Sequence, residues 1–460
     1  MAAPSITVPS WREVMGSGRA RLSAGLALTE FVAGMQSLVV TAAMPKVLKD
    51  LGGVEFYGTV FSGYFLSGLV SIPLAGRAAD REGPTRPFVR GMFVFALGTA
   101  LCAMAPSMPL LAVARVVQGY GAGAAYTIAY GVIAKAYPSP ARPRMLAVLT
   151  FTWVVSGLVA PSIGSILATT VGWRWAFVVI LPLLLLAGVL TVPGLAGLRG
   201  ESEQARVTPT WPLVLAAASG LGLVAAANVH WWSIPIAAVA TVAALLALQR
   251  LMPRGWLRAA PGAASAVTLN LLLYLGFFTA DSFITLLLTE VRGVSLAEAG
   301  VVVTLVAISW SLASWWQSRA ITRYAPALLS FGGSAAFVLG TACVLALLFG
   351  APLWLGYAGW TVAGAGAGIA FPTIMLASMD YAALGDETSA MAARFVSGRI
   401  GIILGTGLGG AAVAIAHDAG RPLAWGLSAV FALALAGGVG CAAASGRLRA
   451  PASGSANAGR

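Results

Sequence analysis

The chain has 460 residues, of which 59% are hydrophobic and only 9% carry a charge. A water-soluble protein of this length needs far more charged surface, so the composition argues against a soluble enzyme or binding module. The formal net charge of +13 would suit a nucleic-acid-binding protein, but the positions of the basic residues argue against that class. The sequence therefore predicts an all-α protein that crosses a membrane many times.

Apolar stretches near the ~20 residues needed to span a bilayer follow a polar tail at residues 1–20. The first six are expected at about 22–45, 57–75, 88–105, 109–134, 145–170 and 175–198. A charged break at 199–210 then precedes two plainer stretches, at about 211–229 and 232–251. After a basic break, six more are expected at about 263–289, 297–317, 327–349, 352–378, 388–416 and 422–445.

These fourteen predicted helices fall into a six, two, six arrangement. We expect an N-terminal six-helix bundle over 1–198 and a linker with two inserted helices over 199–262. A C-terminal six-helix bundle is expected over 263–446 and a disordered tail over 447–460.

The basic residues lie mostly on one side of these spans. With the N-terminus in the cytoplasm, most of the 28 Lys and Arg residues fall in cytoplasmic segments. The external ones are Lys46, Lys49, Arg174, Arg292 and Arg421, and those within spans are Arg115, Arg394 and Arg399. This distribution follows the positive-inside rule and predicts that both termini are cytoplasmic. It gives no indication of nucleic-acid binding.

Other site types have little support. The basic N-terminal segment runs straight into a full-length span, so no cleavable signal peptide is expected. Cys102, Cys343 and Cys441 are scattered over separate spans, and they predict small buried residues rather than a disulfide or a metal site. No cofactor is expected.

A short charged segment at residues 76–83 separates the second and third spans. It contains Gly76, Arg77, Asp80, Arg81 and Gly83, and we expect a tight polar loop at the membrane surface. The register returns at residues 318–325, where Arg319 and Arg323 remain but Thr322 replaces the acid. We call these the first and second charged segments. Together they indicate duplicated halves, as in many transporters.

A glycine-rich stretch in the fourth span also has a counterpart. Residues 118–123 are echoed by residues 363–368, although Trp360 stands where the fourth span has Arg115. Small residues at this spacing let helices approach closely, so simple packing is an alternative to a functional role.

Three motifs resemble signatures of the major facilitator superfamily, in particular its fourteen-helix drug:proton antiporter branch. They are the first charged segment, residues 115–119, and the group Gly157, Pro161 and Gly164 in the fifth span. The resemblance implies a monomeric transporter in a bacterial cytoplasmic membrane, with two pseudo-symmetric six-helix bundles plus two inserted helices. It also implies alternating access, with inward proton flow coupled to outward movement of a small lipophilic compound.

One departure from the branch concerns proton coupling. Residues 36–45 resemble its helix-one pattern, but Gln36 stands where an acid is common. Charged groups inside a membrane are costly and therefore candidates for function. Glu30 lies on a polar stripe with Ser37 and Thr41, and Asp281 corresponds to Gln36 when the two repeats are superposed.

We therefore expect Asp281, Glu30 and Arg115 to carry proton coupling. Counting along the helices places Glu30 level with Arg399, and Arg115 in the same outer half as Asp281. The alternative is that these charges form fixed structural ion pairs.

The resemblance implies that the first and seventh core helices line a central cavity. The residues expected to contact substrate there are Gln36, Ser37, Tyr126, Asn270, Tyr274, Phe278 and Trp310. Aromatic side chains of this kind suit bulky lipophilic compounds, but packing or lipid-facing roles are an alternative for each.

The conformational switch is assigned to the first charged segment and the fifth span. The resemblance implies that Asp80 docks near the start of the eleventh core helix, at residues 386–389. Pro161 lacks a backbone donor and should bend the fifth span between Gly157 and Gly164. Two other functions stay open: an exporter of an endogenous metabolite or lipid, and a polytopic membrane enzyme.

Overall fold

The computed structural model describes residues 19–138, 141–199, 252–382 and 387–448, together with Gly16, Leu246 and Gln249. All regular structure in these residues is helical. Within this part of the chain, eleven helices are long and apolar enough to cross a membrane. The two inserted helices, most of the 199–210 linker and nearly all of the tail lie outside the described residues. The total of fourteen spans therefore stays a prediction.

The chain divides into two compact units, residues 1–51 with 67–211 and residues 52–66 with 212–460. Helix α3 (Tyr57–Glu82) belongs to both, because its residues up to 66 pack with the second unit and the rest with the first. The predicted N-terminal bundle included all of this helix.

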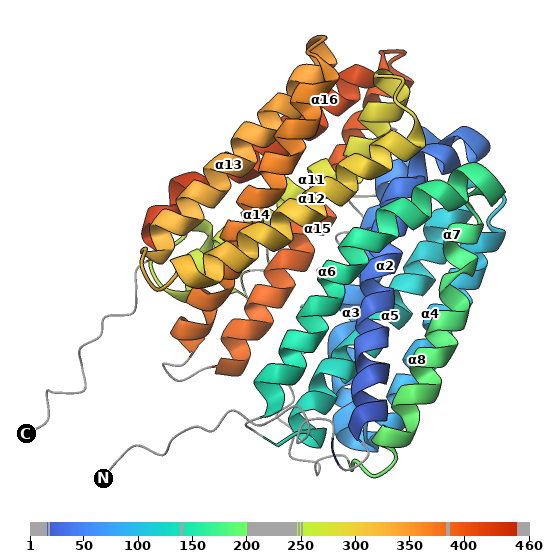
Figure 1. Cartoon of the computed structure of the whole chain (residues 1–460), viewed down its shortest axis with the longest axis vertical. Helices are drawn as coiled ribbons and strands as arrows, with labels where there is room; N and C mark the ends of the chain where they lie inside the picture. Colours follow the sequence, from blue (N-terminus) through green and yellow to red (C-terminus); the bar gives the residue numbers. More distant parts are fainter. Residues whose placement is uncertain are drawn as a thin grey trace, which may run out of the picture. The chain divides into compact units, whose positions relative to one another are not determined.

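The long helices of the first unit pack along one another (Figure 1). Helix α4 lies along α5, and α2 lies along α6 and α8. Their bounds are α2 Arg19–Leu51, α4 Thr85–Met104, α5 Met108–Ala136, α6 Arg142–Leu167, α7 Trp175–Val178 and α8 Ile180–Leu195, with a π-helical turn at Ala168–Gly172.

The second unit contains a second set of helices (Figure 1). Helix α13 lies along α14, while α11 packs on α15 and α16. The bounds are α11 Ala263–Leu286, α12 Leu296–Ala320, α13 Pro326–Ala346, α14 Leu353–Ala382, α15 Glu387–Asp418 and α16 Leu423–Ala444, with short turns at Val54–Phe56, Trp256–Arg258, Leu287–Val291, Leu347–Phe349 and Ser445–Arg447. Each predicted span outside the inserted pair coincides with helical structure, and the ends differ by a few residues.

The glycine-rich stretch of α14 is a packing surface, as one of the two interpretations predicted. A Cβ on Gly364 would lie 2.6 Å from Ser309 Oγ of α12, and one on Gly366 would lie 2.5 Å from Phe337 N of α13. Any side chain there would force the helices apart, because real Cβ contacts are not this short.

Hydroxyl side chains inside the helices mostly bond to their own backbone. Thr29 Oγ1 donates to Gly25 O at 2.9 Å, and Ser282 Oγ donates to Phe278 O at 2.8 Å. Each bond runs back one helical turn, so the hydroxyl is satisfied without a neighbouring helix.

The first charged segment is not the loop that the sequence predicted. Gly76, Arg77, Asp80 and Arg81 all lie in the last turns of α3, and the helix ends only at Glu82. Continuing the helix gives the backbone N–H groups of these residues partners inside the helix, and only the carbonyl groups of its last turn lack such partners. Gly83 alone takes a left-handed conformation, with φ of 81°, and the chain turns there into Pro84 and α4.

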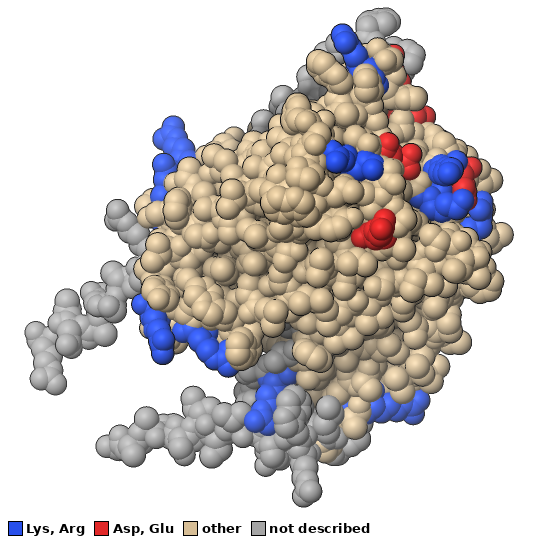
Figure 2. Space-filling view, turned by 45° about the horizontal axis from the view of Figure 1, so that its top comes forward, with Lys and Arg blue, Asp and Glu red and all other residues tan. Residues whose placement is uncertain are grey.

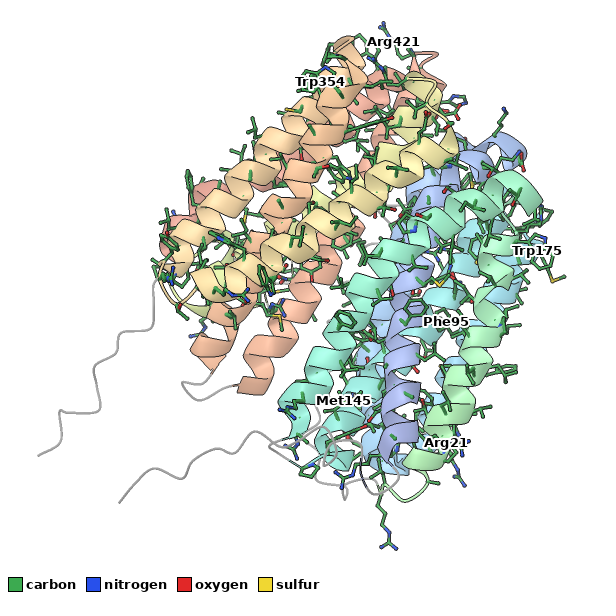
Figure 3. The ribbon with its side chains drawn as sticks, viewed as in Figure 1. Arg21, Phe95, Met145, Trp175, Trp354 and Arg421 are labelled. Atoms are coloured by element: carbon green, nitrogen blue, oxygen red, sulfur yellow. The ribbon has the colours of Figure 1, made fainter. Side chains whose placement is uncertain are left out.

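The outward surfaces of the helices are apolar. Trp175 and Trp354 point away from their helix bundles, and their exposed fractions are 51% and 67% (Figure 3). Phe95 lies between helices and is 1% exposed. Much of the face in Figure 2 carries no charged side chain. An exposed apolar surface of this extent is typical of contact with lipid.

Candidate functional site

Glu30 is completely buried in the first unit and contacts Tyr130, one of a pair of neighbouring tyrosines on α5. Tyr130 Oη donates to Glu30 Oε1 at 3.3 Å, and the rings of Tyr126 and Tyr130 lie 4.6 Å apart. Tyr126 was a predicted cavity residue, whereas Tyr130 was not identified. Its position one turn after Tyr126 on the same helix face was the available signal.

Gln36 lies on the same helix as Glu30 and is also completely buried. Neither its amide oxygen nor its amide nitrogen has a hydrogen-bond partner among the described residues. A buried amide without partners costs about 1–3 kcal/mol, so such groups usually have a reason to persist. Ser37 is half-buried, and its carbonyl accepts a hydrogen bond from Thr41 Oγ1 at 3.2 Å.

Arg115 belongs to a buried polar network between α4 and α5. Its Nη1 donates to Gln118 Oε1 at 2.6 Å, and Gln118 Nε2 donates to Thr99 Oγ1 at 2.9 Å. Thr99 in turn donates to Phe95 O at 2.7 Å. Arg115 is 1% exposed, so its charge is held by these dipoles inside the unit. The network gives Arg115 a structural role whether or not it also acts in coupling.

Asp281 lies on α11 of the second unit and is 4% exposed. Among the described residues, Asp281 takes part in none of the ion pairs Lys46–Asp50, Arg90–Glu82 and Lys135–Asp80. Close by, Tyr57 Oη donates to Ser282 O at 3.3 Å, and the Tyr57 ring lies 5.2 Å from Phe283. Asp281 is thus a buried acid whose next two residues, Ser282 and Phe283, contact Tyr57.

Asn270, one of the predicted cavity residues, joins two helices. Its Nδ2 donates to Arg394 O at 2.9 Å and to Ser397 Oγ at 3.0 Å, which ties α11 to α15. The amide oxygen accepts no hydrogen bond from the described residues. The amide nitrogen of Asn270 therefore links two helices, while its amide oxygen can still accept a hydrogen bond.

The predicted aromatic residues of the second unit come together. Tyr274 stacks on Phe278 with 5.4 Å between ring centroids, and Trp310 stacks on Phe371 at 4.8 Å. Tyr274 also meets Phe371 edge to face at 4.6 Å. Tyr274, Phe278 and Trp310 are half-buried. We call the set the aromatic cluster, and its members are Tyr274, Phe277, Phe278, Trp310, Trp360 and Phe371.

Three members of the aromatic cluster were not predicted as cavity residues. Phe277 stacks on Trp360 with 5.6 Å between centroids and lies 4.9 Å from Trp310. Trp360, the counterpart of Arg115 in the sequence repeat, is completely buried. The position that holds a charged network in the first unit thus holds an aromatic contact in the second.

Arg399 lies over an aromatic ring of the same unit. Its Cζ is 5.4 Å from the centroid of Phe65, which in turn lies 6.4 Å from Phe278. The pairings inferred from depth, Glu30 with Arg399 and Arg115 with Asp281, each join one unit to the other. They stay predictions.

Asp80 of the first charged segment pairs with a lysine that the sequence did not suggest. Lys135 Nζ, at the end of α5, lies 3.3 Å from Asp80 Oδ1. Both side chains are partly exposed, at 22% for Lys135 and 45% for Asp80. The expected docking of Asp80 near residues 386–389 joins the two units and stays a prediction.

The switch residues of the fifth span lie inside α6. Gly157, Pro161 and Gly164 are buried, and the helix continues through Pro161. A Cβ on Gly164 would lie 2.8 Å from Val39 O and 3.3 Å from Ala42 Cβ, so α6 touches α2 directly at this glycine.

We predict that Gly164→Leu reduces transport by about tenfold or more while the protein still inserts into the membrane. Overpacking a tight contact typically costs about 1–3 kcal/mol and displaces the backbone. Initial transport rates at matched protein amounts would measure the effect. Gly188→Leu is the control, because no atom lies within 4 Å of a Cβ at that position in the same unit. A normal rate for Gly164→Leu would show that this contact is dispensable.

A family comparison identifies the fold. Residues 26–406 match the family model described as Major Facilitator Superfamily. The chain belongs to this superfamily. It is therefore a multi-pass membrane transporter and not an enzyme.

Solved structures agree with this fold. The chain is similar to a bacterial homologue of the human lysosomal transporter Spinster, with a TM-score of 0.65, 15% identity and coverage of 94% of this chain and 97% of that one. It is also similar to a POT family peptide transporter, with a TM-score of 0.68, 16% identity and coverage of 95% and 97%. At these identities the likeness shows the fold alone.

Several sequence relatives carry names that refer to drug efflux. The chain is 28% identical over 457 residues to the probable multidrug-efflux transporter Rv1634 of Mycobacterium tuberculosis, covering 92% of this chain and 95% of that protein. It is 30% identical over 186 residues to the multidrug transporter protein MdtP of Bacillus subtilis. That alignment covers 40% of this chain and only 34% of MdtP.

Proposed function

We propose that this transporter exports lipophilic drug-like compounds across a bacterial cytoplasmic membrane. The observation that carries the proposal is the similarity to a multidrug-efflux transporter over 92% of this chain and 95% of the relative. The aromatic cluster supports it, because half-buried rings offer an apolar surface that adapts to bulky compounds of different shape.

We further propose that export is coupled to inward proton flow by alternating access, in a monomer of the fourteen-helix branch. Among the described residues, each unit holds one buried acid: Glu30 accepts a hydrogen bond from Tyr130, and Asp281 precedes Ser282, whose carbonyl accepts one from Tyr57. Such an acid can take up and release a proton as its surroundings change between two conformations. In this proposal, Gln36 contributes hydrogen bonds to substrate. Arg115, a buried positive charge of the first unit, takes part in proton coupling.

The test of export uses a drug-sensitive bacterial host that expresses the chain. We expect raised tolerance to several lipophilic compounds, together with uptake of a fluorescent lipophilic dye into everted vesicles when an inward-acid pH gradient is imposed. A host expressing the Gly164→Leu variant serves as the matched control. Export of no tested compound by a well-expressed protein would contradict the proposal and direct the search to endogenous metabolites.

We predict that both ends of the chain and the 199–210 linker face the cytoplasm. The prediction rests on the distribution of Lys and Arg among the short connecting segments. A Ser202→Cys variant should resist a membrane-impermeant thiol reagent in intact cells and react after permeabilisation. Labelling in intact cells would show that the linker faces the outside and that the predicted orientation is wrong.

We predict that Asp80→Asn slows transport several-fold but leaves substrate binding unchanged, whereas Lys135→Gln slows it by less than about twofold. A partly exposed ion pair contributes at most about 1 kcal/mol, so the pair alone cannot explain a large defect. A role of Asp80 in stabilising one conformation would add to that loss. Transport rates and equilibrium binding of both variants would be compared. Equal defects would mean that Asp80 acts only through Lys135.

A further inference from the structure

The second charged segment differs from the first in its charge balance. Residues 318–325 keep Arg319 and Arg323 but contain no acid, because Thr322 stands at the position of Asp80. Neither arginine takes part in any ion pair within the described residues. The two positive charges of this segment are therefore not neutralised locally.

Arg319 is held in a defined orientation at the end of α12. Its Cζ lies 3.6 Å from the ring centroid of Trp315, and its Nη1 donates to Trp315 O at 3.2 Å. Arg319 is exposed, so the remaining N–H donors point to the surroundings of the protein. A guanidinium stacked on an aromatic ring is preorganised for binding an anion with several oxygens.

The surface beside the two arginines is apolar and aromatic. Trp315 is 63% exposed, Trp316 is 48% exposed and Tyr324 is 49% exposed. Exposed Trp and Tyr at the end of a membrane-spanning helix mark the level of the lipid headgroups. Helix α12 satisfies the length and hydropathy requirements for such a span, and α13 begins shortly after it (Figure 1).

We infer that Arg319 and Arg323, flanked by Trp315, Trp316 and Tyr324, bind the phosphate of an anionic glycerophospholipid. The arginines would donate bidentate or shared hydrogen bonds to the phosphate oxygens, and the tryptophans would contact the glycerol and upper acyl chains. The site lies entirely in the second unit and does not depend on the transported compound. The occupant is a lipid rather than a soluble phosphate, because the apolar side chains flanking the arginines match acyl chains.

The experiment measures lipid binding to the purified full-length protein by native mass spectrometry. The probes are phosphatidylglycerol and phosphatidylcholine with identical acyl chains, titrated separately. We expect phosphatidylglycerol to bind more tightly to the wild type, and the Arg319→Gln/Arg323→Gln variant to lose about fivefold for each arginine removed. Arg319→Lys should keep more of the affinity than Arg319→Gln, since lysine keeps the charge but not the planar guanidinium group.

The matched control is the Arg254→Gln/Arg258→Gln variant. These two arginines are exposed in the same unit, and their replacement changes the net charge by the same amount. An unchanged affinity in the control supports a defined site, and an equal loss in both double variants overturns it in favour of diffuse attraction. Unchanged phosphatidylglycerol affinity in Arg319→Gln/Arg323→Gln also overturns it, as does equal wild-type affinity for phosphatidylcholine. Displacement of phosphatidylglycerol by millimolar inorganic phosphate would overturn the lipid assignment.

Discussion

Asp281→Asn should strongly reduce the accumulation of substrate in liposomes that carry an imposed pH difference. Asp281 is a buried acid without an ion-pair partner among the described residues, so it can exchange a proton without first breaking a salt bridge. Asparagine has nearly the same shape but cannot titrate. We expect the pH-driven component to fall by roughly 5- to 150-fold, the usual range of coupling between two binding events. Exchange of substrate down its own gradient should continue.

The matched control is Asp50→Asn, because Asp50 is an exposed acid that pairs with Lys46 in the preceding helical turn. It should transport normally, because an exposed pair of this kind contributes little. Glu30→Gln is tested in parallel, since Glu30 is the buried acid of the other unit. If Asp281→Asn, Glu30→Gln and the double variant all accumulate substrate against its gradient, neither acid couples transport to protons.

Gly58→Leu should reduce the transport rate by about tenfold or more. A Cβ on Gly58 would lie 2.5 Å from Gly410 Cα, so the first turn of α3 and the C-terminal half of α15 meet backbone to backbone in the second unit. A leucine there has no space and would displace one helix from the other, at a typical cost of about 1–3 kcal/mol. The measurement is the initial rate of transport in liposomes at matched protein content.

Two further variants make this test specific. Gly410→Leu disrupts the same contact. The transport defect of the double variant should therefore be smaller than the sum of the two single defects and close to that of either single variant. Gly131→Leu is the control, because a Cβ there meets nothing within 4 Å. Transport at the wild-type rate by a stable Gly58→Leu protein would show that the close contact is not required.

The helices could be predicted from the sequence because their signal is local. An uninterrupted apolar run determines where a span lies, and the twelve core spans coincide with helices. The first charged segment was misassigned for a physical reason: its charged residues were taken to end the helix. Arginine, glutamate and the two alanines of the segment are good helix formers, and α3 continues to Glu82. Only Gly83, with its positive φ, carries the turn.

The candidate site could be predicted only in part because side-chain contacts join distant residues. Glu30, Asp281 and Tyr274 were identified because a charge or a polar stripe in an apolar span is visible locally. Tyr130 is 100 residues from Glu30, and the sequence does not show that their helices meet there. Phe277 was missed because a phenylalanine inside an apolar helix looks the same in the sequence whether it packs in a core or faces lipid.

The hydroxyl bonds within single helices have a consequence for biosynthesis. A Thr or Ser hydroxyl that bonds to its own helical turn, such as Thr406 with Ile402 O at 2.7 Å, can enter the bilayer without a partner on another helix. Asn270 cannot, because its amide partners lie on α15, 124 and 127 residues later in the chain. Until the ribosome has delivered α15, the newly inserted α11 carries an unsatisfied amide within the membrane. We therefore expect nascent α11 to need a membrane chaperone until α15 has been inserted.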